Sequence, residues 1–306
     1  MPHPHNIMSS LNLQLPSPIT QIFSPRLDTR KLQLFIKRDD LIHPIISGNK
    51  WRKLKYNLQQ AQAEQQTCLL TFGGAWSNHI HATAAAGHYF GFDTIGIIRG
   101  EITPPLTATL QDAQDWGMQL HFVNRERYRH KTEKEFLAEL ELQFGKFYLL
   151  PEGGNNALGM QGCAEIWTEL NEDYDVICVD CGTGTTIAGI ICGHKSPTQI
   201  LGFSVLKGED YLRNDVQAML LRNNCQHHNW HINTDYHFGG YAKTTPGLLD
   251  FIKTFNQQHA IQLEPVYSAK MFYGLFDLIE KGYFKMGSKI LAIHGGGLQG
   301  LRGYRL

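Results

Sequence analysis

Short apolar runs alternate with helix-forming segments along most of the chain, and this alternation constrains the fold more than any other feature. Some runs are apolar at nearly every position, as in strands buried on both faces of a parallel sheet. The expected strands are 32–36, 68–72, 94–98, 120–123, 147–150, 175–179, 200–205 and 289–293. The expected helices are 51–65, 79–88, 107–115, 131–144, 158–170, 187–192, 211–222, 246–256 and 269–281. The sequence therefore predicts an α/β protein with doubly wound parallel sheets.

The length of the chain favours two domains. It has 306 residues, 42% of them hydrophobic, which is enough for a large core. Residues 1–30 are rich in Pro and Ser and are expected to run over the surface. Residues 151–156, Pro-Glu-Gly-Gly-Asn-Asn, interrupt the alternation and are interpreted as a crossing from one domain to the other.

The charge balance points to a small-molecule partner. The 28 basic residues equal the 28 acidic residues in number, whereas nucleic-acid and membrane surfaces normally carry a basic excess. The start of the chain, Met1 to His5, does not resemble a secretory signal, and no run of apolar residues is long enough to span a bilayer. We therefore expect a cytoplasmic protein that binds neither nucleic acid nor membrane.

A glycine- and threonine-rich loop, Gly182-Thr183-Gly184-Thr185-Thr186, follows the expected strand 175–179. Its glycines allow backbone N–H groups to approach an anion, and the helix that follows adds the positive end of its dipole. A dinucleotide fingerprint is not matched, because Ile187 stands at the position of its third glycine. The loop predicts a site for a phosphate monoester, and a plain tight turn is the alternative.

Three basic residues, Lys50, Arg52 and Lys53, fall in the first turn of the expected helix 51–65 and its approach. Cations there oppose the helix dipole by ~0.3–1 kcal/mol each. An anionic ligand would compensate for this cost. A lysine crowded by other cations in a desolvated site would also be a good nucleophile, because its charged form is disfavoured. A solvated basic helix start is the alternative.

The cysteines and histidines give no sign of a metal site. The six cysteines are scattered, which is typical of free thiols in a reducing compartment. Cys178 and Cys181 form a C-x-x-C pair inside an apolar run, which favours core packing over redox or metal chemistry. The fifteen histidines show no familiar ligand spacing, so we expect no bound metal.

Six segments in order carry a resemblance to a known family. The chain resembles the 1-aminocyclopropane-1-carboxylate deaminase and D-cysteine desulfhydrase family of pyridoxal-phosphate enzymes, of fold type II like the tryptophan synthase β-subunit. The match spans nearly the whole chain and is more specific than any single glycine loop. The segments are Lys37-Arg38-Asp39-Asp40, Ser47-Gly48-Asn49-Lys50 continuing to Tyr56, Trp76-Ser77-Asn78-His79, Pro151-Glu152-Gly153-Gly154, Gly182 to Thr186, and Pro265 to Lys270.

The resemblance implies a homodimer that binds pyridoxal 5′-phosphate in a cleft between two doubly wound domains. The larger domain would comprise residues 1–49 and 161–306, and the smaller inserted domain residues 50–160. Lys50 would bind the cofactor covalently and act as the base at the substrate's α-carbon. The implied cofactor contacts are Lys50, Lys53, Asn78, Gly182, Thr183, Gly184, Thr185, Thr186, Ser268 and Gly295. The implied catalytic residues are Lys50, Ser77, Tyr241 and Tyr267, and the implied substrate contacts are Ser77, Asn78, His79, Tyr241 and Tyr267.

The chain departs from the family pattern at several positions. Ser268 stands where the deaminases have a glutamate that keeps the pyridine nitrogen protonated, and Gly295 replaces a threonine. A hydroxyl at this position makes the ring a weaker electron sink, which favours β-elimination from D-cysteine or a similar amino acid. Trp76 and His81 also differ from the family. The alternatives are 1-aminocyclopropane-1-carboxylate deamination and a catalytically silent protein that binds a cofactor or metabolite.

Overall fold

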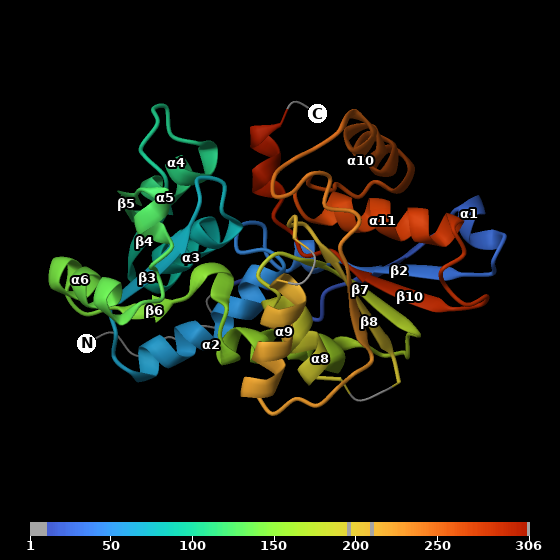
Figure 1. Ribbon diagram of the computed structural model, residues 1–306, viewed down its shortest axis with the longest axis horizontal. Helices are drawn as coiled ribbons and strands as arrows, with labels where there is room; N and C mark the ends of the chain where they lie inside the picture. The colour runs from blue at the N-terminus through green and yellow to red at the C-terminus, as the bar shows by residue number, and fades with distance from the viewer. Residues whose placement is uncertain (1–10, 195–196, 209–210, 305–306) are drawn as a thin grey trace.

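Two β-sheets organise the chain in the computed structural model, which describes residues 11–194, 197–208 and 211–304 (Figure 1). The larger sheet has the order β1-β2-β10-β7-β8-β9 and the smaller sheet the order β5-β4-β3-β6. The strands of the larger sheet are β1 (Ile19–Ile22), β2 (Gln33–Lys37), β7 (Val176–Cys181), β8 (Gln199–Ser204), β9 (Trp230–Asn233) and β10 (Lys289–Ile293). Those of the smaller sheet are β3 (Cys68–Gly73), β4 (Asp93–Arg99), β5 (Gln119–Val123) and β6 (Tyr148–Leu150).

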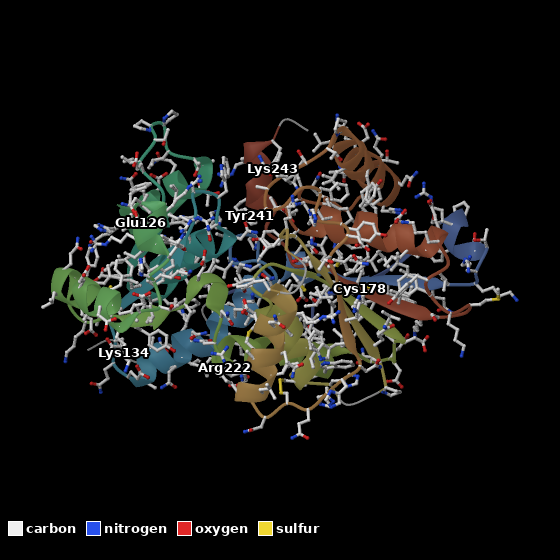
Figure 2. The ribbon with its side chains drawn as sticks, viewed as in Figure 1. Glu126, Lys134, Cys178, Arg222, Tyr241 and Lys243 are labelled. Carbon is white, nitrogen blue, oxygen red and sulfur yellow. A yellow bond between two sulfur atoms is a disulfide. The ribbon has the colours of Figure 1, made fainter. Side chains whose placement is uncertain are left out.

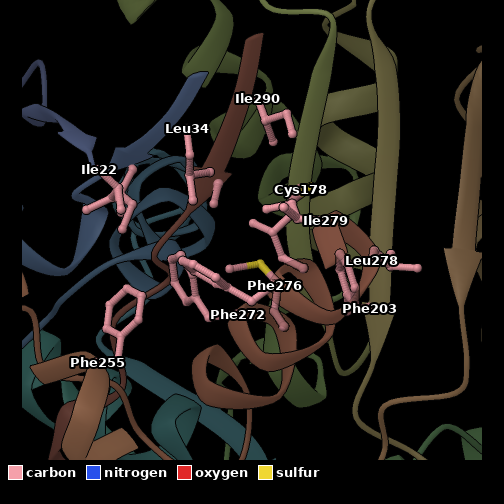
Figure 3. Close-up of a cluster of buried hydrophobic side chains, with 14 of the residues drawn as sticks. Ile22, Leu34, Cys178, Phe203, Phe255, Phe272, Phe276, Leu278, Ile279 and Ile290 are labelled. Carbon is pink, nitrogen blue, oxygen red and sulfur yellow. The ribbon is translucent and has the colours of Figure 1, made fainter. Parts of the chain in front are cut away.

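Helices cover both faces of the larger sheet, where every strand pair is parallel except β1 with β2. Helices α10 (Pro246–His259) and α11 (Ser268–Glu280) lie on one face, and α8 (Thr185–Cys192) and α9 (Tyr211–Arg222) lie on the other (Figure 1). Alternate strand residues therefore enter two separate hydrophobic clusters. On the α11 side, aromatic rings of α10 and α11 fill the space beneath β2 and β10 (Figure 3).

The smaller sheet is parallel throughout. Helix α2 (Asn49–Ala63) joins the two sheets in the sequence, and its Leu54, Leu58 and Ala61 are fully buried on one face, as their spacing predicts. The other helices of this part are α3 (Asn78–Phe90), α4 (Ala108–Asp115), α5 (Arg125–Tyr128) and α6 (Lys134–Phe144). Helix α7 (Ala157–Ala164) packs between α2 and α8, and α1 (Pro25–Asp28) packs against α11 of the larger part. Short 3₁₀ helices cover Asp39–Leu41, Glu152–Gly154, Glu165–Glu169 and Leu298–Gly303.

The predicted α/β class and every predicted strand are confirmed, with boundaries that move by a few residues. The predicted helices are also confirmed, except that the helix expected over 158–170 ends as an α-helix at Ala164 and is followed by the 3₁₀ helix Glu165–Glu169. Strands β1 and β9 were not predicted. Both are short strands at the edges of the larger sheet, where β1 pairs with β2 and β9 with β8, so burial does not impose a strong pattern on them. The interpretation of Met1 to His5 falls outside the described residues.

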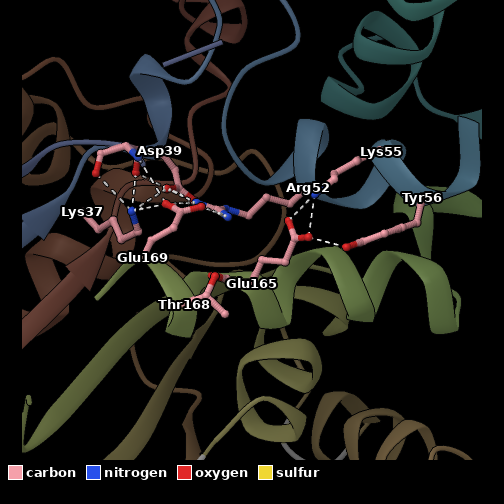
Figure 4. Close-up of polar contacts among 9 residues, drawn as sticks. Lys37, Asp39, Arg52, Lys55, Tyr56, Glu165, Thr168 and Glu169 are labelled. Atoms are coloured by element: carbon pink, nitrogen blue, oxygen red, sulfur yellow. Dashed lines mark hydrogen bonds and ion pairs between the residues drawn. The ribbon is translucent and has the colours of Figure 1, made fainter. Parts of the chain in front are cut away.

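A buried ion-pair network connects the start of α2 to the end of β2 and to the 3₁₀ helix Glu165–Glu169 (Figure 4). Arg52 donates to both carboxylate oxygens of Asp39, at 2.6 and 2.8 Å, and to Glu169 at 2.8 and 3.0 Å. Lys37 Nζ adds a 2.6 Å contact to Glu169. The cost of Arg52 at a helix start is therefore offset by these carboxylates, and the expected anionic ligand is not needed to explain this residue.

The prediction that all cysteines are free thiols is wrong for one pair. Cys192, at the end of α8, and Cys225, after α9, form a disulfide across a Cα–Cα distance of 5.5 Å. The two helices pack against each other, which brings together residues 33 positions apart in the sequence. Cys178 and Cys181 remain free and buried, as the core-packing interpretation predicts. Within the described ranges, none of the helices is both long and apolar enough to cross a bilayer.

Candidate active site

A cavity of about 670 Å³ brings most of the predicted site residues together. It is lined from both sheets, at the carboxyl ends of β3 and β7 and at the start of α2, and Tyr241 lies at the junction of the two halves of the ribbon (Figure 2). Ligands in open parallel sheets bind at such ends. The predicted residues on its wall are Lys50, Lys53, Ser77, Asn78, His79, Gly182, Thr183, Gly184, Thr186, Tyr241 and Tyr267.

Lys50 is held at the cavity by a close contact between two turns. Gly48 has a φ of +62°, and a Cβ atom there would lie 1.9 Å from the carbonyl oxygen of Gly295. The amide of Asn49 donates to the same oxygen at 3.2 Å, and this fixes the first turn of α2. Lys50 Nζ donates to Asn49 Oδ1 at 2.6 Å. Loss of solvent, followed by repulsion from Lys53, lowers the pKa of Lys50 to about 7.

The loop from Gly182 to Thr186 and the N-terminus of α8 form one end of the cavity. Gly184 has a φ of +78°, which turns the chain into the helix. The hydroxyl groups of Thr183 and Thr185 lie 3.1 Å apart, and Asn49 Nδ2 donates to Thr186 Oγ1 at 3.2 Å. The helix therefore starts with N–H groups and hydroxyl groups gathered around one side of the cavity.

Lys53 lies on the same wall and is only 4% exposed. In the part of the chain that the structure describes, its ammonium group has no ion pair or hydrogen bond. Burial lowers its pKa, and a bound anion would remove the cost of keeping it charged. An unpaired cation next to a helix N-terminus fits the phosphate group of pyridoxal phosphate.

Ser77, Asn78 and His79, at the start of α3, also line the cavity. Ser77 caps the helix, because its Oγ accepts from the amides of His79 and Ile80, each at 3.2 Å. Asn78 lines the cavity, its Oδ1 accepts from Gln299, and its Nδ2 lies beside Gly297. Burial, with Lys50 and Lys53 nearby, lowers the pKa of His79 to about 3, so its ring is neutral at physiological pH.

Tyr241 and Tyr267 meet edge to face, with ring centroids 5.9 Å apart. Tyr241 comes from the loop before α10, and Tyr267 immediately precedes α11. Loss of solvent raises the pKa of both hydroxyl groups. Both side chains are therefore neutral phenols that can donate a hydrogen bond at physiological pH.

Three residues that the resemblance implied as cofactor contacts lie off this cavity wall: Thr185, Ser268 and Gly295. The hydroxyl of Ser268 accepts from the Glu264 amide at 2.9 Å and lies 3.3 Å from the Glu264 carbonyl. Gly295 contributes its carbonyl to the start of α2. Trp76 lines an adjoining cavity of about 280 Å³, and His81 is bonded to Asp112 at 3.0 Å.

Sequence reasoning missed two buried carboxylates near the site. Asp180 lies on the cavity wall in β7, two residues before the glycine loop. Glu264 accepts from the amides of Val266, Tyr267 and Ser268 at 2.6–2.7 Å, and burial raises its pKa to about 7. An acidic residue inside an otherwise apolar strand is the signal by which the sequence could have identified Asp180.

Comparisons with known proteins agree with this arrangement. The family model described as "Pyridoxal-phosphate dependent enzyme" matches residues 12–296. The chain is 33% identical over 311 residues to the mitochondrial "Bifunctional D-cysteine desulfhydrase/1-aminocyclopropane-1-carboxylate deaminase" of Arabidopsis thaliana, covering 94% of this chain and 77% of the relative.

Two solved structures show a similar fold. The crystal structure of a homologue of 1-aminocyclopropane-1-carboxylate deaminase superimposes with a TM-score of 0.80 at 30% identity, covering 94% of this chain and 91% of that one. A fungal L-serine ammonia-lyase from Rhizomucor miehei has a TM-score of 0.66 at 14% identity, covering 93% and 94%. The second likeness concerns the fold alone.

Proposed function

The chain belongs to the family of pyridoxal-phosphate-dependent enzymes, and on that premise we propose that it is a lyase that eliminates a β-substituent from a small amino acid such as D-cysteine. Elimination releases an enamine, which water hydrolyses to a 2-oxo acid and ammonia, and sulfide is the leaving group when the substrate is D-cysteine. The observation that carries this proposal is the position of Lys50, whose pKa is lowered to about 7 on the wall of a cavity that also presents an anion site.

The cofactor is pyridoxal phosphate, and when bound it withdraws the electron pair left at the substrate's α-carbon. Lys50 binds it, and Lys53 with the loop from Gly182 to Thr186 holds its phosphate. Asn78 Nδ2 donates to its ring oxygen. The burial of these groups keeps water from the reacting atoms.

The chain's own groups orient the substrate and move its protons. The hydroxyl of Ser77 and the start of α3 bind the substrate carboxylate, which sets the α-carbon opposite Lys50. The Lys50 amine takes the α-proton as the bond from the β-carbon to sulfur breaks and the thiolate leaves with its electron pair. The phenols of Tyr241 and Tyr267 face the departing group and donate to it. The position of these residues on one cavity wall supports this proposal.

The proposal is tested with purified protein, added pyridoxal 5′-phosphate and a panel of D- and L-amino acids. We expect ammonia and a 2-oxo acid from D-cysteine, and a visible absorbance band that the Lys50→Ala variant lacks. Its activity should fall about a thousandfold or more. The control is Lys55→Ala in the same helix, because Lys55 is bonded to Glu165 at 2.6 and 2.8 Å and is absent from the wall. No turnover of any panel member would contradict the proposal.

A second candidate is the ring opening of 1-aminocyclopropane-1-carboxylate, and Asp180 favours it. This substrate has no α-hydrogen, so its reaction depends on a strong electron sink. A carboxylate on the cavity wall can supply what the hydroxyl of Ser268 does not. The ratio of kcat/KM for the two substrates decides between the candidates.

The finer organisation of the enzyme is also proposed. Residues 1–49 with 161–306 would form one domain and residues 50–160 the other, in keeping with the two sheets. We propose a homodimer that works in the cytoplasm. Analytical ultracentrifugation and fractionation of the source cells test these two points, and a monomer or an organellar location would contradict them.

A further inference from the structure

Asp180 is an acidic residue in an otherwise apolar strand. It is the fifth residue of β7, Val-Ile-Cys-Val-Asp-Cys, and is 6% exposed. Its side chain reaches the cavity wall. Over the described ranges, the Asp180 carboxylate forms no hydrogen bond or ion pair with another residue. A buried carboxylate without a partner is costly, so this group is expected to have one when the site is filled.

The surroundings of Asp180 place it within the cofactor site. Its Oδ2 atom lies 3.3 Å from the position that a Cβ atom on Gly295 would take. Burial raises the pKa of Asp180, and the charges of Lys50, His294 and Lys53 oppose that rise. Because Gly295 has no side chain, the carboxylate can extend into the space beside it.

Pyridoxal phosphate has four groups that need partners: the aldehyde carbon, the phosphate, the ring oxygen, for which Asn78 is proposed, and the ring nitrogen. Lys50 serves the first, and Lys53 with the loop from Gly182 to Thr186 serves the second. The ring nitrogen is left. Ser268 is not its partner, because this residue lies off the cavity wall and its hydroxyl is bonded to the backbone of Glu264.

The other carboxylates nearby already have partners. Glu264 accepts three backbone amides at the start of α11. Glu152 lies 3.4 Å from the ammonium of Lys131, and Asp215 is hydrogen-bonded to Tyr211. We propose that the Asp180 carboxylate accepts a hydrogen bond from the protonated ring nitrogen of pyridoxal phosphate and thereby replaces the carboxylate that Ser268 does not provide.

This inference rests on the proposed function, since it assumes that the cofactor binds in this cavity. A carboxylate beside the ring nitrogen keeps that nitrogen protonated and strengthens the electron sink. The hydroxyl at position 268 would then not restrict the enzyme to β-elimination, and ring opening would also be within its reach.

The test is nuclear magnetic resonance of the holoenzyme carrying pyridoxal phosphate labelled with ¹⁵N in the ring. In the wild type we expect the chemical shift of a protonated pyridine. In Asp180→Asn we expect a shift toward that of a neutral pyridine, because the amide cannot stabilise the positive charge. The matched control is Asp215→Asn, which removes another acidic group from the same wall and should leave the signal unchanged.

A neutral ring nitrogen in the wild type, or an unchanged signal in Asp180→Asn, would overturn the proposal. If Asp180→Asn does not retain cofactor, Ser268→Ala and Glu264→Gln decide. A neutral nitrogen in either variant would assign the role elsewhere, and a protonated nitrogen in both supports Asp180. The measurement needs no turnover. Failure to find a substrate would therefore count against the proposed function and not against Asp180.

Discussion

The position of the Lys50 amine disfavours its charged form. The side chain follows a helix start, where the dipole disfavours a cation, and Lys53 adds a second positive charge nearby. Asp180 and Glu264 partly counter both effects. The balance lowers the pKa of Lys50 to about 7, so a large fraction of the amine is neutral at physiological pH.

Attachment of cofactor to Lys50 should depend on pH accordingly. We expect the rate of covalent attachment of pyridoxal to cofactor-free protein to rise as pH passes about 7 and to level off above it, because only the neutral amine attacks. Pyridoxal is used because a phosphate group titrates at roughly 6 and would obscure the profile. Stopped-flow absorbance measures the rate.

The Lys53→Met variant provides the control for this profile. Repulsion from Lys53 lowers the pKa of Lys50, so its removal should move the midpoint to higher pH. A midpoint near the ordinary lysine value of about 10.4 in the wild type would contradict the expected desolvation.

The start of α2 is the element on which the site depends most. It requires glycine at position 48, because φ is +62° and the Gly295 carbonyl occupies the space of a side chain. The Gly48→Ala variant should lose at least about 1–2 kcal/mol of unfolding free energy from the left-handed conformation alone. It should also bind cofactor more weakly, because the displaced turn carries Lys50.

Urea unfolding and cofactor titration measure the two effects of Gly48→Ala. The matched control is Gly247→Ala, near the start of α10, where an added Cβ meets no atom within 4 Å. This variant should keep wild-type stability to within about 0.5 kcal/mol. Equal behaviour of the two variants would show that the contact between Gly48 and Gly295 is not required.

The disulfide ties α8 to the end of α9 and should stabilise the fold. It closes a loop of 33 positions, for which chain entropy predicts a contribution of about 3–4 kcal/mol. We expect dithiothreitol to lower the melting temperature of the wild type. The Cys225→Ser variant should already melt at the lower temperature and should not respond to the reductant. A response in that variant would contradict this explanation.

The charges around Arg52 tie α2 to the end of β2 and to the 3₁₀ helix Glu165–Glu169. When one partner of a buried ion pair is removed, the other charge stays buried without a partner. This lowers the unfolding free energy by about 3–5 kcal/mol. We expect Arg52→Met to lose that much unfolding free energy, because among the described residues Asp39 and Glu169 then keep only Lys37 as a cationic partner. The control is Arg26→Met, whose exposed pair with Glu280 should contribute less than about 1 kcal/mol.

The same network makes the unfolding free energy of the protein depend on pH. Burial alone would raise the pKa of Asp39 and Glu169, but contacts with Arg52 and Lys37 lower both values overall. The pKa of each is then lower in the folded than in the unfolded chain. The stabilisation is complete above the ordinary carboxyl pKa of roughly 4 and is lost as pH falls below it. Urea unfolding at pH 3–6 should show a shallower loss in Arg52→Met than in the wild type.

The sequence by itself determined the α/β class, because runs of apolar residues and glycine turns are local signals that recur at each strand end. It also determined the family and the loops that meet at the cavity. Motifs of this kind remain readable because the chemistry of a phosphate or a lysine requires particular residues at short spacing. The strands β1 and β9 were not predicted, because they lie at the edges of the larger sheet and their residues need not follow an apolar pattern.

Only the tertiary structure decided which residues meet. Arg52 is paired with Asp39 and Glu169, which are 13 and 117 positions away, and Cys192 finds Cys225 across a helix pair. Burial of Asp180 beside Gly295 likewise joins two segments that the sequence keeps far apart. Such contacts depend on how sheets and helices pack, and packing is set by the whole chain rather than by any local pattern of residues.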